Sequence, residues 1–143
     1  MSNCIVAPVP IQLVDFMWPH VEPHLDRVVK IAEDEISLQS IKAKLYNGSS
    51  MLVAVIKDNI VIAAITMEKL TFENGRSALV LPVVGGDELD EWVDQVIELA
   101  KIIAKDIGCQ ELRGLGARKG WSRKLKNTGW QDAYMVLKYN LEN

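Results

Sequence analysis

The stretch that decides the fold is Leu79-Val80-Leu81-Pro82-Val83-Val84, which is followed directly by Gly85-Gly86. Its density of Leu and Val is typical of a buried strand. Residues 87–107 then carry apolar side chains at helical spacing, and residues 111–115 form a second short strand pattern. Because a helix that crosses over between two strands of one sheet leaves them parallel, we predict a parallel contact between these two strands.

Upstream of the long helix the sequence predicts an antiparallel meander. Three apolar runs rich in β-branched residues occupy residues 51–56, 60–67 and 77–84. Asp58-Asn59 makes the turn between the first two runs. Asn74-Gly75 lies between the last two, and this pair is favoured in tight hairpins, where φ must be positive.

The N-terminal third of the chain predicts one strand and two helices. Residues 3–14 contain Pro8 and Pro10, and proline cannot donate to a central ladder, so this segment is typical of an edge strand or an extended arm. A helix is predicted to open at Trp18-Pro19, because proline suits a first helical turn. Ser37 is the predicted N-cap of a second helix.

The C-terminal residues complete the predicted order. A short basic helix is expected over residues 118–128, and a final strand region over 130–141. The order is therefore strand, helix, helix, three strands, helix, strand, helix, strand. It predicts a single domain over residues 1–143, of the α/β class in its α+β form, with a mixed, mostly antiparallel sheet flanked by helices.

Composition argues against several classes of function. Hydrophobic residues make up 49% of the chain and the net charge is −3, so no global field favours nucleic acid or an anionic membrane. No apolar run reaches the ~18 residues of a membrane span, and we expect no signal peptide. Cys4 and Cys109 lie in no ligand cluster and are expected to be reduced thiols in a cytoplasmic protein. His20 and His24 share a helix face without an evident third ligand, so no metal site is expected.

This order of elements resembles that of the GNAT N-acetyltransferases over nearly the whole chain. The resemblance is carried by strand 79–84 with Gly85-Gly86 ahead of the long helix, by Gly108-Cys109 with Glu111-Leu112-Arg113-Gly114, and by Leu125-Lys126-Asn127-Thr128-Gly129-Trp130. Residues 116–125 also resemble a divergent acyltransferase-like group encoded by bacteriophages and prophages. For such a protein the expected location is the host cytoplasm or the virion.

The resemblance implies transfer of an acetyl group from acetyl-CoA to an amine by direct attack, the amine belonging to a small molecule or a protein. In the family, the pantetheine arm inserts beside the strand before the long helix, and the pyrophosphate lies on N–H groups at the helix N-terminus. The matching positions here are Val83, Val84, Gly85, Gly86, Asp87 and Glu88. The glycines would allow the cofactor to approach the backbone closely.

The resemblance also implies an acid and a base. The family's general base is often a glutamate on the meander, and Glu68, at the end of a central strand, is the first candidate. The family's frequent tyrosine acid falls on Leu125, which cannot donate a proton, so Tyr134 is the candidate replacement.

Departures from the family pattern leave a second interpretation open. The Arg or Gln that leads the family's phosphate loop has no match here. Asp87 is expected to cap the long helix with its own carboxylate, and Glu88, Asp90 and Glu91 add negative charge that opposes a pyrophosphate. The alternative is a non-enzymatic phage or virion-associated interaction module that keeps the fold.

A basic cluster near the C-terminus has four open interpretations. Its members are Arg113, Arg118, Lys119, Arg123, Lys124 and Lys126, with Trp121 and Trp130 interleaved. It can be a solvated helix face, a contact for the phosphates of CoA, or a nucleic-acid contact, although the acidic chain argues against the last. The remaining interpretation is a docking surface for a protein partner through Arg118, Lys119, Trp121 and Arg123. The sequence carries no indication of the oligomeric state.

Overall fold

The computed structural model describes residues 3–32, 35–114, 125–126, 128–133 and 137–142. Its described strands form one five-stranded sheet with the order β1-β2-β3-β4-β5. The strands are β1 (Cys4–Val9), β2 (Ser50–Lys57), β3 (Ile60–Thr71), β4 (Ser77–Gly86) and β5 (Glu111–Gly114). The helices are the 3-10 turn η1 (Ile11–Leu13) and the α-helices α1 (Val14–Ala32), α2 (Leu38–Tyr46) and α3 (Leu89–Asp106).

The pairing of the strands confirms the predicted mixed sheet. Neighbouring strands from β1 to β4 are antiparallel, so the meander is present. The contact between β4 and β5 is parallel and runs from Ala78↔Glu111 to Leu81↔Gly114. Asp58 and Asn59 make the turn between β2 and β3 with φ of 51° and 65°, values that Asn and Asp tolerate better than most residues.

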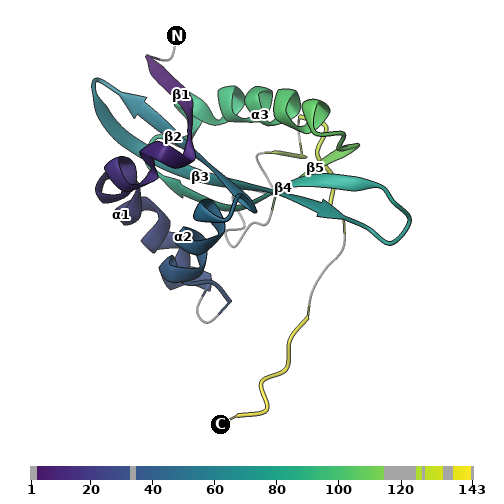
Figure 1. Ribbon diagram of the computed structural model, residues 1–143. Helices are drawn as coiled ribbons and strands as arrows, with labels where there is room; N and C mark the ends of the chain where they lie inside the picture. The colour runs from purple at the N-terminus through teal and green to yellow at the C-terminus, as the bar shows by residue number, and fades with distance from the viewer. Residues whose placement is uncertain (1–2, 33–34, 115–124, 127, 134–136, 143) are drawn as a thin grey trace.

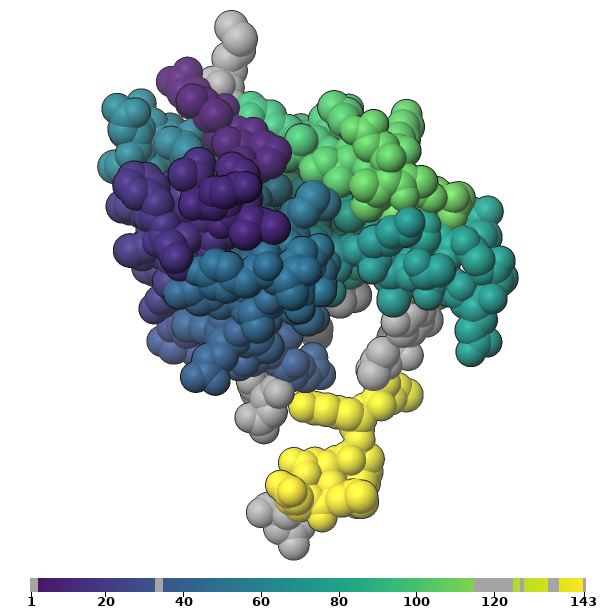
Figure 2. All heavy atoms as spheres, in the orientation of Figure 1, coloured from purple at the N-terminus to yellow at the C-terminus, as the bar shows by residue number. Residues whose placement is uncertain are grey.

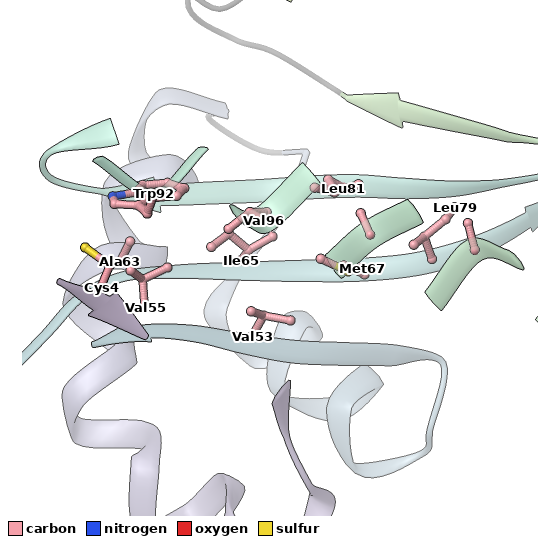
Figure 3. Close-up of a cluster of buried hydrophobic side chains, with 12 residues drawn as sticks. Cys4, Val53, Val55, Ala63, Ile65, Met67, Leu79, Leu81, Trp92 and Val96 are labelled. Atoms are coloured by element: carbon pink, nitrogen blue, oxygen red, sulfur yellow. The ribbon is translucent and has the colours of Figure 1, made fainter. Parts of the chain in front are cut away.

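The helices cover both faces of the sheet, with α3 on one and α1 and α2 on the other (Figure 1). Each face carries its own hydrophobic core. The α3 side packs Ile65 and Met67 of β3 against Trp92 and Val96 of the helix (Figure 3). Trp92 is only 1% exposed, so it anchors α3 in this core. The second core packs α1 and α2 on the opposite face.

The start of the first long helix differs from the prediction. Helix α1 begins at Val14, four residues before Trp18, so Pro19 and Pro23 lie inside it. A proline inside a helix removes a backbone hydrogen bond at a cost of ~3 kcal/mol or more. Burial of Val14 and Val21 on the sheet offsets part of this cost, because each is at most 1% exposed.

The second helix begins where the sequence predicts. Ser37 accepts a hydrogen bond from the Ser40 backbone N–H, and the Ser40 side chain accepts from the Ser37 N–H in return. This reciprocal capping satisfies two N–H groups that a helix start otherwise leaves without partners.

The C-terminal part departs from the predicted order where it is described. Leu125, Lys126 and Thr128 of the predicted basic helix are described; the first two are helical and Thr128 lies in a turn. The described parts of the predicted last strand, 130–133 and 137–142, are not in a strand. In Figure 2 the yellow end of the chain, nearest the C-terminus, stands away from the body of the protein. No helix of the described residues is long and apolar enough to cross a membrane.

Candidate acyl-transfer site

A bulge in the middle of β4 shapes the candidate site. Glu68 pairs with Val80 and Thr66 pairs with Val83, so Leu81 and Pro82 on β4 lie opposite the single residue Met67 on β3. This two-against-one arrangement is a β-bulge, and it bends the strand that carries it. The extra residue also places Val80 and Val83 on the same face of the sheet, where both line one pocket.

Beyond the bulge, one edge of β4 has no strand partner among the described residues. The pairing with β5 ends at Leu81↔Gly114, whereas β4 continues to Gly86. The Asp87 N–H donates to Ile62 O at 2.9 Å, toward β3. Because backbone groups alternate in direction along a strand, the N–H and C=O of Val84 point away from β3. With respect to the described part of the chain, Val84 therefore offers a donor and an acceptor to an extended ligand.

A pocket of about 320 Å³ lies between α2 and the sheet, on the face opposite α3. Three strands and α2 with its preceding loop line it. The polar or charged lining residues are Ser40, Lys44, Ser50, Thr66, Glu68 and Lys69, and the apolar ones are Ile36, Ile41, Leu70, Val80, Pro82 and Val83. The pocket thus combines an apolar wall from β4 with a polar group centred on β3, as small-molecule sites commonly do.

Glu68, the predicted base, is the centre of that polar group. Its Oε1 accepts from Ser50 Oγ at 2.8 Å and from Lys44 Nζ at 3.2 Å. Its Oε2 lies 3.5 Å from the same Lys44 Nζ. The Glu68 side chain keeps 27% exposure, so the carboxylate is fixed by two partners and still accessible.

The two predicted phosphate-loop glycines face the protein itself. A Cβ on Gly85 would lie 2.1 Å from the carbonyl oxygen of His24 in α1. A Cβ on Gly86 would lie 2.3 Å from the Ala63 Cβ on β3. These glycines therefore allow α1 and β3 to approach β4 closely, whereas the prediction assigned the close approach to a cofactor.

The start of α3 corrects the prediction that Asp87 caps it. The N-cap is Glu88, in a left-handed conformation with φ of 57°, and its side chain makes no capping hydrogen bond. The Asp87 carboxylate instead accepts from Arg27 of α1 at 2.8 Å, and the Asp87 carbonyl accepts from Trp92 Nε1 at 2.7 Å. The first turn of α3 is therefore free of the carboxylate cap that the sequence predicted.

Asp87, Glu88 and Glu91, at or near this helix start, have basic partners from other elements. The hydrogen bond from Arg27 lowers the pKa of Asp87, and the hydrogen bonds to Glu88 and Glu91 raise the pKa of Lys57. The Asp87 contribution to stability is present at neutral pH and is lost as the pH falls through its lowered pKa. Since the Arg27 and Asp87 side chains are 46% and 57% exposed, this contribution is small.

His24 has a structural position. Its Nε2 donates to the Val61 carbonyl at 2.9 Å, which links α1 to the start of β3. Its Nδ1 is buried without a hydrogen-bond partner. Among the described residues, no three His, Cys, Asp or Glu side chains cluster in a way that could hold a metal ion. Neither Cys4 nor Cys109 forms a disulfide.

Several predicted functional residues lie outside the described residues. They are Tyr134, the candidate acid, and Arg118, Lys119, Trp121 and Arg123 of the candidate docking surface. Two basic-cluster residues are described: Arg113 bonds Glu111 and lies over the Phe72 ring, and Lys126 pairs with Asp132.

Sequence reasoning missed the partners of Glu68. In the sequence, Lys44 looks like an ordinary exposed lysine of a helix, and Ser50 follows Gly48-Ser49 without belonging to any motif. The Ser50↔Glu68 register and the packing of α2 on the sheet bring them together. No short-range pattern in the sequence carries this information.

Comparison with known proteins identifies the fold. No family model matches the sequence, and no curated protein matches it. Solved structures do match. One is an aminoglycoside acetyltransferase from an uncultured soil metagenomic sample, in complex with trehalose. It superposes with a TM-score of 0.71 at 9% identity and covers 98% of this chain and 97% of that one. A predicted acetyltransferase with acetyl-CoA from Clostridium acetobutylicum gives 0.69 and 12%, covering 96% of each chain.

A ribosomal-protein-alanine N-acetyltransferase from Brucella melitensis gives a TM-score of 0.68 at 12% identity, covering 96% of this chain and 99% of that one. At such low identity these likenesses show the fold alone. The chain has the GNAT acetyltransferase fold, as the resemblance predicted. The closer resemblance to the phage and prophage group stays a prediction.

Proposed function

We propose that this protein is an N-acyltransferase that moves an acetyl group from acetyl-CoA to a primary amine. The observation that carries the proposal is the position of Glu68. Its carboxylate lies in a pocket whose other wall, Val80 to Val83, leads directly into the β4 edge that has no described strand partner. A base and a strand edge suited to a pantetheine arm thus meet at one pocket, in a fold shared with acetyltransferases.

The described residues fit acetyl-CoA at two points. The N–H and C=O of Val84 match an extended arm that carries amide groups, as in the pairing of strands. The first turn of α3 carries no side-chain cap, so its N–H groups can face a pyrophosphate. Two described cations contact residues at the start of α3. Arg27 pairs with Asp87, and Lys57 pairs with Glu88.

The chemistry needs a group that accepts one proton in the pocket. Acetyl-CoA, when bound, supplies a thioester whose carbonyl carbon forms the new C–N bond as the C–S bond breaks and CoA leaves as its thiolate. Glu68 holds the incoming amine and accepts the proton that the nitrogen loses. Ser50 holds the carboxylate in place by its hydrogen bond to Oε1. Tyr134 stays the candidate acid that returns a proton to the leaving thiolate.

Ligand-induced stabilisation tests the proposal. Acetyl-CoA at one hundred times its Kd should add about 2.7 kcal/mol to the free energy of unfolding. Val84→Pro removes the N–H that points away from β3 and leaves the β3 ladder intact. The ligand-free variant should melt at a modestly lower temperature, because Val84 packs on the core beneath α3, and it should lose the stabilisation by acetyl-CoA. Absence of any shift with the wild type at millimolar acetyl-CoA would end the proposal and leave the non-enzymatic interpretation.

Charge at the start of α3 should tune cofactor affinity. Asp87→Asn releases Arg27 and removes one negative charge, so acetyl-CoA should bind about twofold to fivefold more tightly, as expected for one charge at a helix N-terminus. Calorimetric titration at low salt measures this, because salt screens exposed charges. Asp106→Asn, at the other end of α3, is the matched control. Equal affinities of Asp87→Asn and wild type would show that the phosphates bind elsewhere.

A further inference from the structure

We infer that the acceptor is a small zwitterion, a molecule that carries an anionic group close to its primary amine, and that Lys44 and Glu68 recognise its two charges. The inference rests on the proposed function and concerns the acceptor that the same pocket takes. It follows from the ion pair that already occupies the centre of the pocket.

The two charges come from different layers of the fold. Lys44 projects from α2 and Glu68 from β3, and their charged groups meet at 3.2 Å inside the pocket lining. Ser50, which is buried, holds Glu68 from the side of β2. Glu68 is therefore fixed from the sheet, whereas Lys44 reaches it by a long side chain that is half exposed. Of the two, Lys44 is the group that can move when a ligand enters.

A simple cationic amine fits this arrangement poorly. To reach the Glu68 carboxylate it must displace Lys44, and the displaced ammonium group then loses its anion and lies next to a second cation. The remaining charged residue of the pocket lining, Lys69, cannot neutralise the displaced ammonium group, because it is also a cation. Its Nζ donates to the Ile107 carbonyl at 3.0 Å. The cationic amine and the displaced Lys44 ammonium group would repel each other inside the pocket, and the repulsion is stronger where water is partly excluded.

A zwitterion fits without leaving either charge unpaired. Its ammonium group takes the place of Lys44 beside Glu68, and its anionic group takes the place of Glu68 beside Lys44. One ion pair becomes two, and the net charge of the pocket does not change. Both contacts are charge-assisted hydrogen bonds, which are stronger than neutral ones.

The size and walls of the pocket restrict the zwitterion further. A volume of about 320 Å³ is at the lower end for small-molecule sites, and it suits a molecule of amino-acid size. Ile41, Val80 and Val83 give it an apolar side that would contact the remainder of the acceptor. A lysine side chain carries no anionic group of its own close to the amine, so the arrangement favours a small zwitterion over an exposed protein lysine.

The test compares each amino acid of a panel with its own carboxamide, which keeps the amine and loses the anion. With acetyl-CoA as donor and released CoA thiol as readout, the wild type should give a kcat/KM at least about tenfold higher for the acid than for the amide, the effect of one charge-assisted contact. Lys44→Met should remove this preference, mainly through KM, and should improve turnover of the amides.

A matched control comes from the same helix. Lys42 lies outside the pocket lining, with its Nζ over the Trp18 ring at 5.0 Å, so Lys42→Met should keep the preference of the wild type. Equal or better turnover of the amides by the wild type would overturn the inference while the proposed function stands, and so would failure to acetylate any amino acid of the panel with acetyl-CoA bound. Absence of acetyl-CoA binding would instead mark failure of the proposed function.

Discussion

Glu68→Gln is expected to lower kcat for amine acetylation by about 10²–10⁴-fold, the usual contribution of a positioned acid or base. The amide cannot take the proton that the amine nitrogen loses as it attacks. It can still accept hydrogen bonds from Ser50 and Lys44, which now bind the carboxylate at 2.8 and 3.2 Å. The variant should therefore fold normally, and its affinity for acetyl-CoA should be unchanged because the proposed cofactor contacts lie at Val84 and at the start of α3, away from Glu68.

Steady-state kinetics with a fixed acceptor, together with calorimetric titration of acetyl-CoA, separates these effects. Glu73→Gln is the control, since Glu73 is an exposed residue of the loop between β3 and β4, outside the pocket lining. If kcat of Glu68→Gln stays within about threefold of the wild-type value, the change is too small for the loss of a general base. Glu68 would then not be the base.

Gly85→Ala is expected to be one of the two most disruptive conservative changes in β4. The new methyl group would lie 2.1 Å from the His24 carbonyl oxygen and 2.9 Å from its carbon, so α1 would have to move away from the sheet. We expect destabilisation at or above the upper end of the ~1–3 kcal/mol that overpacking usually costs. Gly86→Ala should cost more, because a clash with Ala63 combines with a φ of 148°.

Gly48→Ala is the matched control for these two variants. Gly48 has a φ of 83°, but nothing lies within 4 Å of an added Cβ, so the control isolates backbone strain from steric clash. Chemical denaturation monitored by tryptophan fluorescence gives the three free energies of unfolding. A Gly85→Ala variant less destabilised than Gly48→Ala would show that α1 does not pack on β4 as described.

Local patterns in the sequence predicted most of the fold. The hairpin turn at Asp58-Asn59 and the cap at Ser37 depend on neighbouring residues alone, and both are found where predicted. The parallel contact of β4 and β5 follows from the helix between them. Helix α1 begins at Val14, earlier than the preference of proline for a first helical turn predicts from Pro19. The packing of Val14 on the sheet outweighs that preference.

The site was less predictable, because its contacts join residues far apart in the chain. The sequence indicated Glu68 through the family resemblance, and the structure places it in the pocket. Asp87 has the residue type and position of an N-cap, but Arg27, sixty residues earlier, binds its carboxylate instead. Lys44 and Ser50 likewise reach Glu68 only once α2 and β2 are assembled. Propensity rules contain no term for such partners.

The order of the strands in the sheet has a consequence for synthesis on the ribosome. Across the described strands, position in the sheet equals position in the chain, from β1 at one edge to β5 at the other. Each newly made strand can therefore add to the outer edge of the one made before it. No described strand has to wait for a later one to be inserted between itself and its neighbour, so this sheet can grow in the order in which it is translated.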